Sequence, residues 1–320
     1  MNSISLAIII VNYNTKDLLR KCLSSIRSNS SGLALKTIVV DNHSKDNSLE
    51  MIRSEFPEVL AIDSGSNVGY GRANNIGISS IESPLYLFLN PDTVVLDNAL
   101  ERMVNAINSD QIKGALSCQF VHEDGRIHSL GLQWFPSLFS EALSWFLLTD
   151  STIRLLRGYL PYQDPNVSGY VKKLYGTALL IKREVLNEIG TFDERFFMYG
   201  EDVDLSMRIA EGGWKLYYLS EARIIHYVGA ASGGQSKFSV LMMRQSISEL
   251  MHKYYGFRGF VCYRFIVFLG SSYRIVVLMF NAFAKKVLCR QQDSASTQSL
   301  NKYWWTVKWA LGIERIEIAD

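Results

Sequence analysis

Short apolar runs alternate with amphipathic segments through the first third of the chain. The runs at 6–11, 37–40, 60–62 and 85–89 are rich in β-branched or aromatic residues, which is typical of buried strands. Between the first two, apolar residues recur at helical spacing from 18 to 26. This strand–helix–strand alternation predicts an α/β fold with a mostly parallel, doubly wound sheet flanked by helices.

Beyond residue 95 the pattern is less regular. It predicts helices at 96–109, 182–188 and 200–212, strands at 114–121, 175–181, 214–219 and 222–225, and a hairpin turn at 123–126. The aromatic stretch 134–162 fits either core packing or a mobile lip over a binding site. The lip is favoured, because long insertions in α/β proteins are often functional loops.

Polar side chains stand where several predicted strands end. Asp41 follows the second strand, Asn90-Pro91-Asp92 follows the strand at 85–89, and His226 follows the last one. In an open α/β sheet, ligands bind beyond the carboxyl ends of the strands, so Asp92 stands where a metal-bound diphosphate could sit. Each position also has a plainer explanation, as an Asx turn, a β-turn or a structural histidine.

Two further segments carry candidate chemistry. Residues 67–77, NVGYGRANNIG, form a glycine-rich segment that allows close backbone approach, although the spacing is not GxGxxG. Glu201, Asp202 and Asp204 open a predicted helix, where acidic residues also favour the helix dipole or form a solvated face. Neither segment identifies a reaction on its own.

Composition narrows the class of protein. The chain has 320 residues, and 48% of them are hydrophobic, which is enough to form a sizeable core. The formal net charge of +2 gives no indication of nucleic-acid binding. Its four cysteines lack metal-ligand or redox spacing, which suits a reducing compartment. The N-terminal apolar run is too short for a signal peptide, so we expect a cytosolic N-terminus.

The last 80 residues have a different character. Residues 250–292 contain no Asp or Glu but seven Lys or Arg among many aromatic side chains. The segment 259–283 is long enough to span a bilayer, but Arg264 and Arg274 interrupt it. A helix lying in an anionic membrane interface fits better than a membrane span or a soluble packing or oligomer helix.

Taken in order, these segments resemble the family 2 glycosyltransferases, inverting enzymes with a GT-A fold. The match spans residues 5–232 and is most similar to the rhamnosyltransferase-like members of bacterial surface-polysaccharide assembly. It is carried by IIIVNYN (8–14), IVVDN (38–42), NVGYGRANNIG (67–77), LFLNPDT (87–93), GTALLIKREVLNEIGTFDERFFMYGEDVDLSMRIAEGGWKLYYL (176–219) and His226 with Gly229.

The resemblance implies a role for each matched position. Asp202 is the catalytic base, and Glu201 beside it orients the helix start or binds acceptor. Asp92, in the place of the family's Asp-x-Asp motif, and His226 hold Mg²⁺ or Mn²⁺. The nucleotide-sugar pocket is lined by Asn12, Asp41, Asn67, Gly69, Asn75, Asn90, Asp92 and Gly176. Asn90 is a departure, because it replaces the first acid of the motif and leaves one fewer negative ligand.

The implied fold is a Rossmann-like, nucleotide-binding GT-A domain at 1–240, followed by a basic, aromatic and helical extension at 241–320 that associates with the membrane. The implied reaction moves L-rhamnose from dTDP-rhamnose to a lipid-linked glycan in O-antigen, capsule or exopolysaccharide biosynthesis. A UDP-sugar donor and a non-catalytic membrane-associated scaffold remain alternatives. Nucleotidyl transfer is weaker, since no glycine-rich, basic phosphate-activating loop is present.

The expected partners are the nucleotide-sugar donor, the glycan acceptor and the inner-membrane surface, without nucleic acid. We expect a cytoplasmic protein that is peripheral on the cytoplasmic face of the inner membrane. The sequence leaves homo-oligomerisation open.

Overall fold

The computed structural model describes residues 5–30, 32–109, 114–129, 133–147, 152, 163–229, 236–289 and 294–316. The chain forms two compact units. The first comprises Met1–Phe135 and Pro161–Gly234, and the second comprises Pro136–Leu160 and Gln235–Ala319. The second unit therefore begins a few residues before the expected boundary at 240 and also takes in a segment from the middle of the chain.

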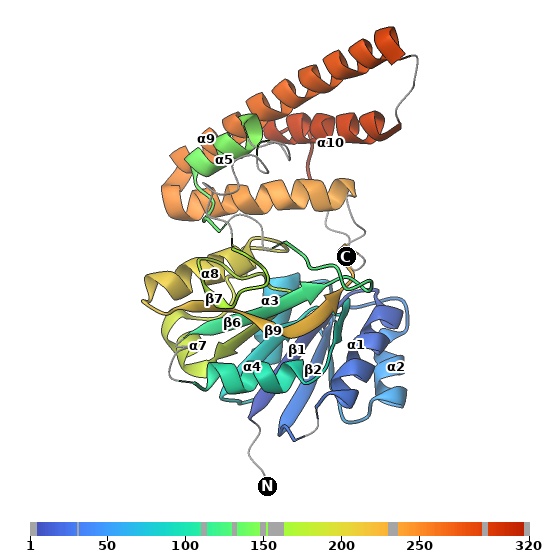
Figure 1. Cartoon of the computed structure of the whole chain (residues 1–320), viewed down its shortest axis with the longest axis vertical. Coiled ribbons are helices and arrows are strands. Elements are labelled where there is room, and N and C mark those ends of the chain that lie inside the picture. The colour runs from blue at the N-terminus through green and yellow to red at the C-terminus, as the bar shows by residue number, and fades with distance from the viewer. Residues whose placement is uncertain are drawn as a thin grey trace. The chain divides into compact units, whose positions relative to one another are not determined.

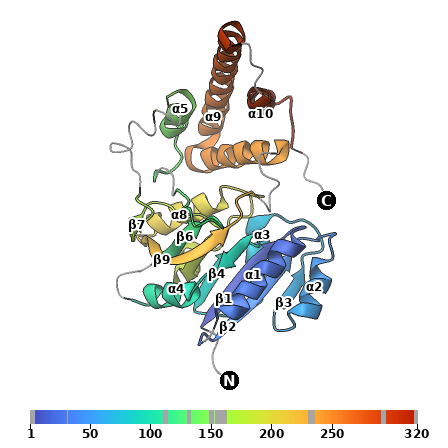
Figure 2. The same cartoon turned by 45° about the vertical axis from the view of Figure 1, so that its right-hand side comes forward.

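The first unit is an α/β unit (Figures 1 and 2). Its strands are β1 (Leu6–Asn12), β2 (Leu35–Asp41), β3 (Leu60–Asp63), β4 (Leu85–Leu89), β5 (Thr93–Val95), β6 (Ala115–Val121), β7 (Gly169–Val171), β8 (Ala178–Lys182) and β9 (Leu216–His226). Its helices are α1 (Lys16–Ser28), α2 (Ser48–Glu55), α3 (Tyr70–Ser79), α4 (Ala99–Ile107), α7 (Arg183–Ile189) and α8 (Glu201–Glu211).

The described strands form one sheet in the order β3-β2-β1-β4-β8-β6-β9-β5, with β7 also paired to β9. Strands β3, β2, β1 and β4 are mutually parallel, because a helix returns the chain between each consecutive pair. Strand β8 runs antiparallel to both β4 and β6, and β5 and β7 run antiparallel to β9. The predicted α/β class is confirmed, but the sheet is mixed rather than mostly parallel.

Both faces of the sheet are covered, which explains the uninterrupted apolar runs. Alternate β1 residues face opposite layers. Ile8 and Ile10 join the core formed with α1, α2 and α4, whereas Ile9 and Val11 join the core formed with α3, α7 and α8. The carboxyl ends of β1, β2 and β4 are thereby fixed at one edge of a rigid layer.

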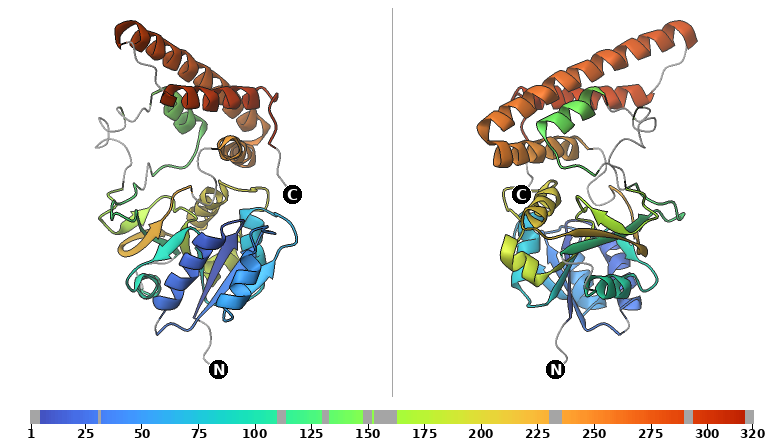
Figure 3. Two further views of the ribbon diagram at one scale, coloured as in Figure 1. Left: turned by 90° about the vertical axis from the view of Figure 1, so that its right-hand side faces the viewer. Right: turned by 60° about the vertical axis from the view of Figure 1, so that its left-hand side comes forward.

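The second unit is helical and consists of α5 (Leu138–Phe146), α9 (Lys237–Cys289) and α10 (Ser294–Ala310), in which α5 and α10 both pack against α9 (Figure 3). Its core includes Trp145 from α5, Tyr263 from α9 and Trp309 from α10. Leu138, Trp145 and Phe146 thus serve core packing, whereas Phe139 is exposed. Residues 148–151 and 153–162 of the expected lip lie outside the described part of the chain.

Helix α9 is two helices joined at Gly256, whose φ of 66° and ψ of −166° are not helical. Only glycine adopts such angles without strain, so the bend is set by the residue type. From Lys237 to Phe283 the described chain holds one helix that is long and apolar enough, by length and composition, to cross a membrane.

Candidate active site

The ends of β1 and β2 bring Asn12 and Asp41 together in register. Both side chains are fully buried, and Asn12 Nδ2 donates to Asp41 Oδ2 over 2.6 Å. Asp41 Oδ1 accepts from the backbone N–H of Ser44 at 2.7 Å, and Asn12 Oδ1 accepts from Thr15 Oγ1. These bonds hold the carboxylate rigidly at the edge of the sheet, where spare lone pairs of its oxygens can accept further hydrogen bonds.

A second pair, Asp92 and His226, is assembled from distant parts of the chain. Strand β5 pairs with the end of β9, and the backbone N–H of Tyr227 donates to the carbonyl of Asp92. His226 Nε2 lies 3.5 Å from Asp92 Oδ1, with the Asp92 side chain 3% exposed. The structure therefore brings together the two residues that were expected to hold a metal.

The chemistry of this pair fits a divalent cation with part of its coordination sphere supplied by a ligand. A carboxylate suits Mg²⁺ and Mn²⁺, and an imidazole suits Mn²⁺. Among the described residues, no group of three or more His, Cys, Asp or Glu side chains is arranged to hold a metal. Asp92 and His226 are thus too few to complete a six-coordinate site alone, and a cation there would need further oxygen ligands from a bound molecule or from water.

Asn90 lies in the turn between β4 and β5. Its backbone N–H donates to the carbonyl of Thr177 at 2.9 Å, and its carbonyl accepts from Thr93 Oγ1 at 2.8 Å. These bonds fix the turn that carries Asp92. Asn90 therefore lies at the expected edge of the sheet, two residues from the carboxylate.

Asp202 is held in the first turn of α8. Its Oδ2 accepts from the backbone N–H of Gly176 at 3.0 Å, and its Oδ1 accepts from the N–H of Val203 at 2.8 Å. Gly176 eases this approach, because an added Cβ would lie 3.3 Å from the Cβ of Asp202 and would require a shift of a few tenths of an ångström. On the other side of the same residue, Tyr70 Oη donates to the carbonyl of Gly176 at 3.0 Å.

Burial raises the pKa of the Asp202 carboxyl above its ordinary value, while the N–H groups of Gly176 and Val203 and the charge of Lys173 act in the opposite direction. Burial also raises the pKa of Glu201 well above its ordinary value, and the Asp202 charge adds to this effect. Glu201 is 6% exposed, and its Oε2 has no hydrogen-bond partner within the described ranges. Because Asp202 accepts from two backbone N–H groups and Glu201 Oε2 accepts from none in the described chain, a proton shared by the pair is favoured on Glu201.

The segment 67–77 contacts the loop that leads to the acidic pair. Gly69 has a φ of 86°, and a Cβ there would meet the carbonyl oxygen of Phe197 at 2.5 Å. The N–H of Tyr70 donates to that same oxygen at 2.7 Å. Asn67 Oδ1 accepts from the Gly69 N–H at 3.3 Å in a local turn. These contacts fix the loop just ahead of α8.

Asn75, expected in the nucleotide pocket, also binds this loop. Its Nδ2 donates to the carbonyl of Phe192 at 2.9 Å, and its Oδ1 accepts from the Phe192 N–H at 3.0 Å. The side-chain amide thereby pairs with both backbone groups of one residue. In this structure Asn75 positions the acidic loop.

Sequence reasoning missed the imidazoles near His226. The rings of His122 and His128 stack with centroids 3.8 Å apart, and the His128 ring lies 5.9 Å from that of His226. Burial lowers the pKa of His128, and the charges of the other two histidines add to this. A hollow of about 580 Å³ beside them is lined by His122, Glu123, Asp124, His226, Tyr227, Val228 and Gly229. In the sequence, the predicted hairpin turn at 123–126 was the feature that pointed to this hollow. The pairing of β6 with β9, which brings its walls together, is not visible in the sequence.

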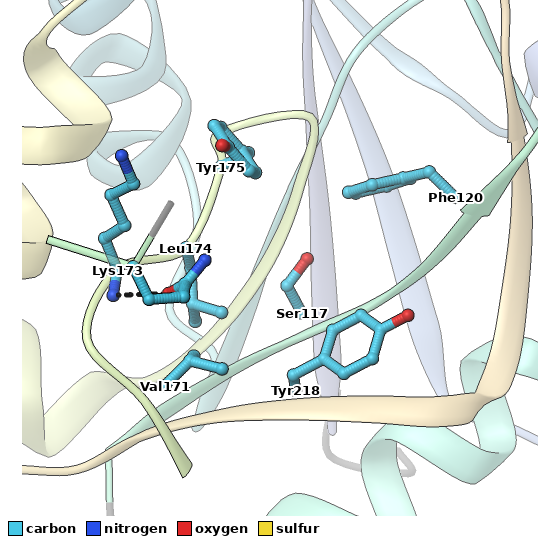
Figure 4. A pocket seen from close by; sticks show the side chains of 8 residues that line it. Ser117, Phe120, Val171, Lys173, Leu174, Tyr175 and Tyr218 are labelled. Carbon is cyan, nitrogen blue, oxygen red and sulfur yellow. Dashed lines mark hydrogen bonds between the residues drawn. The ribbon is translucent and has the colours of Figure 1, made fainter. Parts of the chain in front are cut away.

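A smaller pocket, lined in part by Lys173, whose charge acts on Asp202, was also missed (Figure 4). Gln133 Oε1 accepts from the backbone N–H of Lys173 at 3.3 Å, and the rings of Phe120 and Tyr175 border the space. Its other lining residues are Ser117, Val171, Leu174 and Tyr218. Its volume of about 10 Å³ has room for about one water molecule, so in this form the pocket does not hold a sugar.

Comparison with known proteins fits this geometry. The model of the family described as Glycosyl transferase family 2 matches residues 7–190, more than half of the chain. The chain is 26% identical over 245 residues to the N-acetylglucosaminyl-diphospho-decaprenol L-rhamnosyltransferase of Mycobacterium tuberculosis, covering 71% of this chain and 78% of that protein. It is 27% identical over 227 residues to Rhamnosyltransferase WbbL of Escherichia coli (strain K12), covering 69% and 82%.

A solved structure shares the fold. The mannosyltransferase PcManGT from Pyrobaculum calidifontis, determined with GDP-Man and Mn²⁺, aligns over 98% of this chain and 88% of that chain, with a TM-score of 0.57 and 13% sequence identity. At that identity the likeness concerns the fold, and it confirms the GT-A architecture. With the family model covering β1 to α7, the chain belongs to glycosyl transferase family 2, as a rhamnosyltransferase-like member.

Proposed function

We propose that the chain transfers L-rhamnose from dTDP-rhamnose to a lipid-linked glycan with inversion at the anomeric carbon. The observation that carries this proposal is the environment of Asp202, a buried carboxylate held by two backbone N–H groups at the start of α8. The names of the rhamnosyltransferases to which the chain is similar support the donor sugar. The decaprenol named in one of them supports a lipid-linked acceptor.

In the proposed reaction the acceptor hydroxyl attacks the anomeric carbon of the donor. Its proton passes to Asp202, a new glycosidic bond forms, and the bond from that carbon to the diphosphate breaks, releasing the nucleoside diphosphate. A positioned carboxylate base supplies about 10²–10⁴-fold in such a step. No protein nucleophile takes part, so a single displacement inverts the configuration. Glu201, favoured in its protonated form, donates a hydrogen bond to the acceptor or steadies the helix start.

Asp92 and His226 are the proposed ligands of Mg²⁺ or Mn²⁺, with the Asn90 side chain nearby as a further oxygen donor. A divalent cation held there would neutralise the charge that develops on the leaving diphosphate. The 3.5 Å approach of the imidazole to the carboxylate supports the assignment. Both residues face the same edge of the sheet as the nucleoside site.

The nucleoside is proposed to bind at the ends of β1 and β2. Asp41 accepts from the base or ribose, and Asn12 keeps it oriented through their 2.6 Å hydrogen bond. Asn67, Gly69 and Gly176 border the pocket through their backbone. Asn75 contributes indirectly, because it fixes the neighbouring loop through Phe192.

The enzyme is proposed to work at the cytoplasmic face of the inner membrane as a peripheral protein, since a lipid-linked acceptor resides there. The basic helix α9 supports this location. The catalytic domain is assigned to residues 1–240 and the membrane-associating extension to 241–320, together with α5, which packs on α9.

The experiment that tests the reaction compares Asp202→Asn with a matched control, Glu211→Gln, at the exposed far end of the same helix. Release of nucleoside diphosphate from dTDP-rhamnose and from UDP-sugars is measured with a lipid-linked acceptor. Asp202→Asn is expected to lose at least about 10²-fold in kcat while folded, and the control to keep its rate. Near wild-type turnover by folded Asp202→Asn would remove Asp202 as the base. Faster turnover of a UDP-sugar than of dTDP-rhamnose would show that the donor is a UDP-sugar. No turnover with any donor would favour the non-catalytic scaffold.

A further inference from the structure

The second half of α9, from Phe257 to Phe283, has two apolar faces. On one face Tyr263, Val267 and Ser271 are fully buried against the other helices of the second unit. Along this face two arginines reach helix ends: Arg264 donates to the carbonyls of Trp309 and Ala310 in α10, and Arg274 donates to those of Ser144 and Trp145 in α5. Cations that cap carbonyls at helix C-termini stabilise both ends. This face of α9 is therefore covered by α5 and α10 within the second unit.

The opposite face is uncovered and equally apolar. Its exposed side chains recur three or four residues apart and so form one continuous stripe. We call this set the α9 stripe: Phe257, Val261, Phe265, Leu269, Tyr273, Val276, Met279, Phe280 and Phe283. Phe257, Phe280 and Phe283 are 71%, 69% and 67% exposed. Single exposed apolar residues are ordinary, but a row this long marks an interaction surface.

The charge around the stripe selects the partner. Between Glu249 and Asp293 the chain has no acidic residue and carries seven Lys or Arg. Two of these, Arg264 and Arg274, are bound on the other face, and the remaining five lie in the sequence at or beyond the two ends of the stripe. An apolar face with basic flanks is complementary to a surface that is apolar inside and negatively charged outside. A second copy of this chain does not meet that description, because two cationic faces repel each other. We propose that the α9 stripe inserts into the interface of a bilayer that contains anionic lipids.

The stripe lies in the plane of the bilayer rather than across it. The 27 helical residues from Phe257 to Phe283 measure about 40 Å, which is long enough for a membrane span by length alone. A span, however, takes Arg264 and Arg274 into the hydrocarbon, together with the ends of α10 and α5 to which they are bound. Lying flat, α9 gives one face to the lipid and keeps the other on α5 and α10. This inference deepens the peripheral location proposed above and is independent of the donor sugar.

The test uses flotation of the full-length protein with vesicles. One set is phosphatidylcholine alone, and the other contains about 30 mol% phosphatidylglycerol. The wild type is expected to bind the anionic vesicles at least about tenfold more tightly, to lose most of that preference in high salt, and to be released by alkaline carbonate. Equal binding to both vesicles, or resistance to carbonate, would overturn the proposed anionic interface or the flat orientation.

Variants locate the surface. Phe265→Glu with Phe280→Glu is expected to reduce binding at least tenfold, because both side chains are exposed and belong to the stripe. Ile313→Glu is the matched control, since Ile313 is 70% exposed but outside the stripe. If the double variant proves misfolded by circular dichroism, Arg258→Glu, at an exposed residue beside Phe257, tests the same surface by weakening binding to anionic vesicles alone. Wild-type binding by folded stripe variants would refute the proposal. So would a change from dimer to monomer without a change in vesicle binding.

Turnover is measured separately in the same proteins with a soluble acceptor analogue. Stripe variants are expected to keep their rate of nucleoside diphosphate release in solution. If the wild type floats as expected but transfers no sugar, the proposed reaction fails and the membrane surface stands. If it transfers sugar but does not float with anionic vesicles, the proposed membrane surface fails and the proposed reaction stands.

Discussion

Tyr70→Phe removes one hydroxyl group that supports Asp202 from a distance. The phenol donates to the carbonyl of Gly176, and the N–H of Gly176 donates to Asp202, each over 3.0 Å. Tyr70 thus acts as a positioning residue through the backbone of a single residue, Gly176. Because the carbonyl and the N–H of Gly176 flank the same Cα, loss of the phenol loosens this stretch of backbone and so weakens the N–H bond to the carboxylate.

The size of the effect follows from this one bond. A typical intramolecular hydrogen bond contributes about 0.5–1.5 kcal/mol net, and about 1.4 kcal/mol corresponds to a factor of ten in rate. If that energy serves to place Asp202, kcat falls about two- to tenfold while KM for the donor stays constant. The weaker N–H bond raises the pKa of Asp202 further, so the acidic limb of the pH–rate profile moves to higher pH.

The chain offers a matched control in Tyr86→Phe. Tyr86 is buried in β4, and its hydroxyl donates to the carbonyl of Ile81 at 2.9 Å, which is the same kind of bond away from Asp202. Both variants are expected to lose similar thermal stability, measured by circular dichroism. Only Tyr70→Phe is expected to change kcat and the pH profile in a nucleoside diphosphate release assay. An unchanged pH profile in Tyr70→Phe, or equal losses of kcat in both variants, would refute the positioning role.

Three further predictions concern the metal pair, the acidic loop and Glu201. Asp92→Asn and His226→Ala are expected to raise the divalent-cation concentration for half-maximal turnover by at least about tenfold, and unchanged metal titrations would contradict the assignment. Gly69→Ala forces a Cβ to 2.5 Å from the carbonyl of Phe197 at positive φ, so it is expected to lower the free energy of unfolding by about 1–3 kcal/mol in urea melts. Burial raises the pKa of Glu201 in the folded state, so its contribution to stability is full below about pH 4 and is lost as pH rises through the folded pKa. Glu201→Gln is therefore expected to stabilise the protein at pH 7.5 but not near pH 4, and equal shifts in Tm at both values would argue against a perturbed Glu201.

The parallel half of the sheet could be predicted from the sequence because its signals are local. Strands β1, β2, β3 and β4 are apolar runs separated by single helices, and such crossovers fix their direction. The direction of β8 could not be predicted, since the chain between β6 and β8 is not one short helix. Strands β5 and β7, with three residues each, carry too little pattern to be recognised.

The residues of the candidate site also fall into those that could be predicted from local sequence and those that could not. Asp41, Asp92 and His226 were found because each directly follows an apolar strand, and strand ends converge in this class of fold. The contact of Tyr70 with Gly176 joins residues 106 positions apart in the chain, and no local pattern marks it. The role of Asn75 in holding Phe192 is hidden for the same reason, since an amide in a glycine-rich segment suggests a ligand contact equally well.

The inclusion of α5 in the helical unit has a practical consequence for anyone who shortens this protein. The polypeptide passes between the two units three times, near residues 135, 160 and 235, so no single stop codon separates them. A chain ended at 234 keeps α5 but loses α9 and α10, and the indole of Trp145, only 6% exposed in the intact protein, is left without its packing partners. Such a fragment is expected to aggregate and to be difficult to purify. An isolated catalytic unit calls for an internal deletion as well, with residue 135 joined to residue 161 by a short flexible linker.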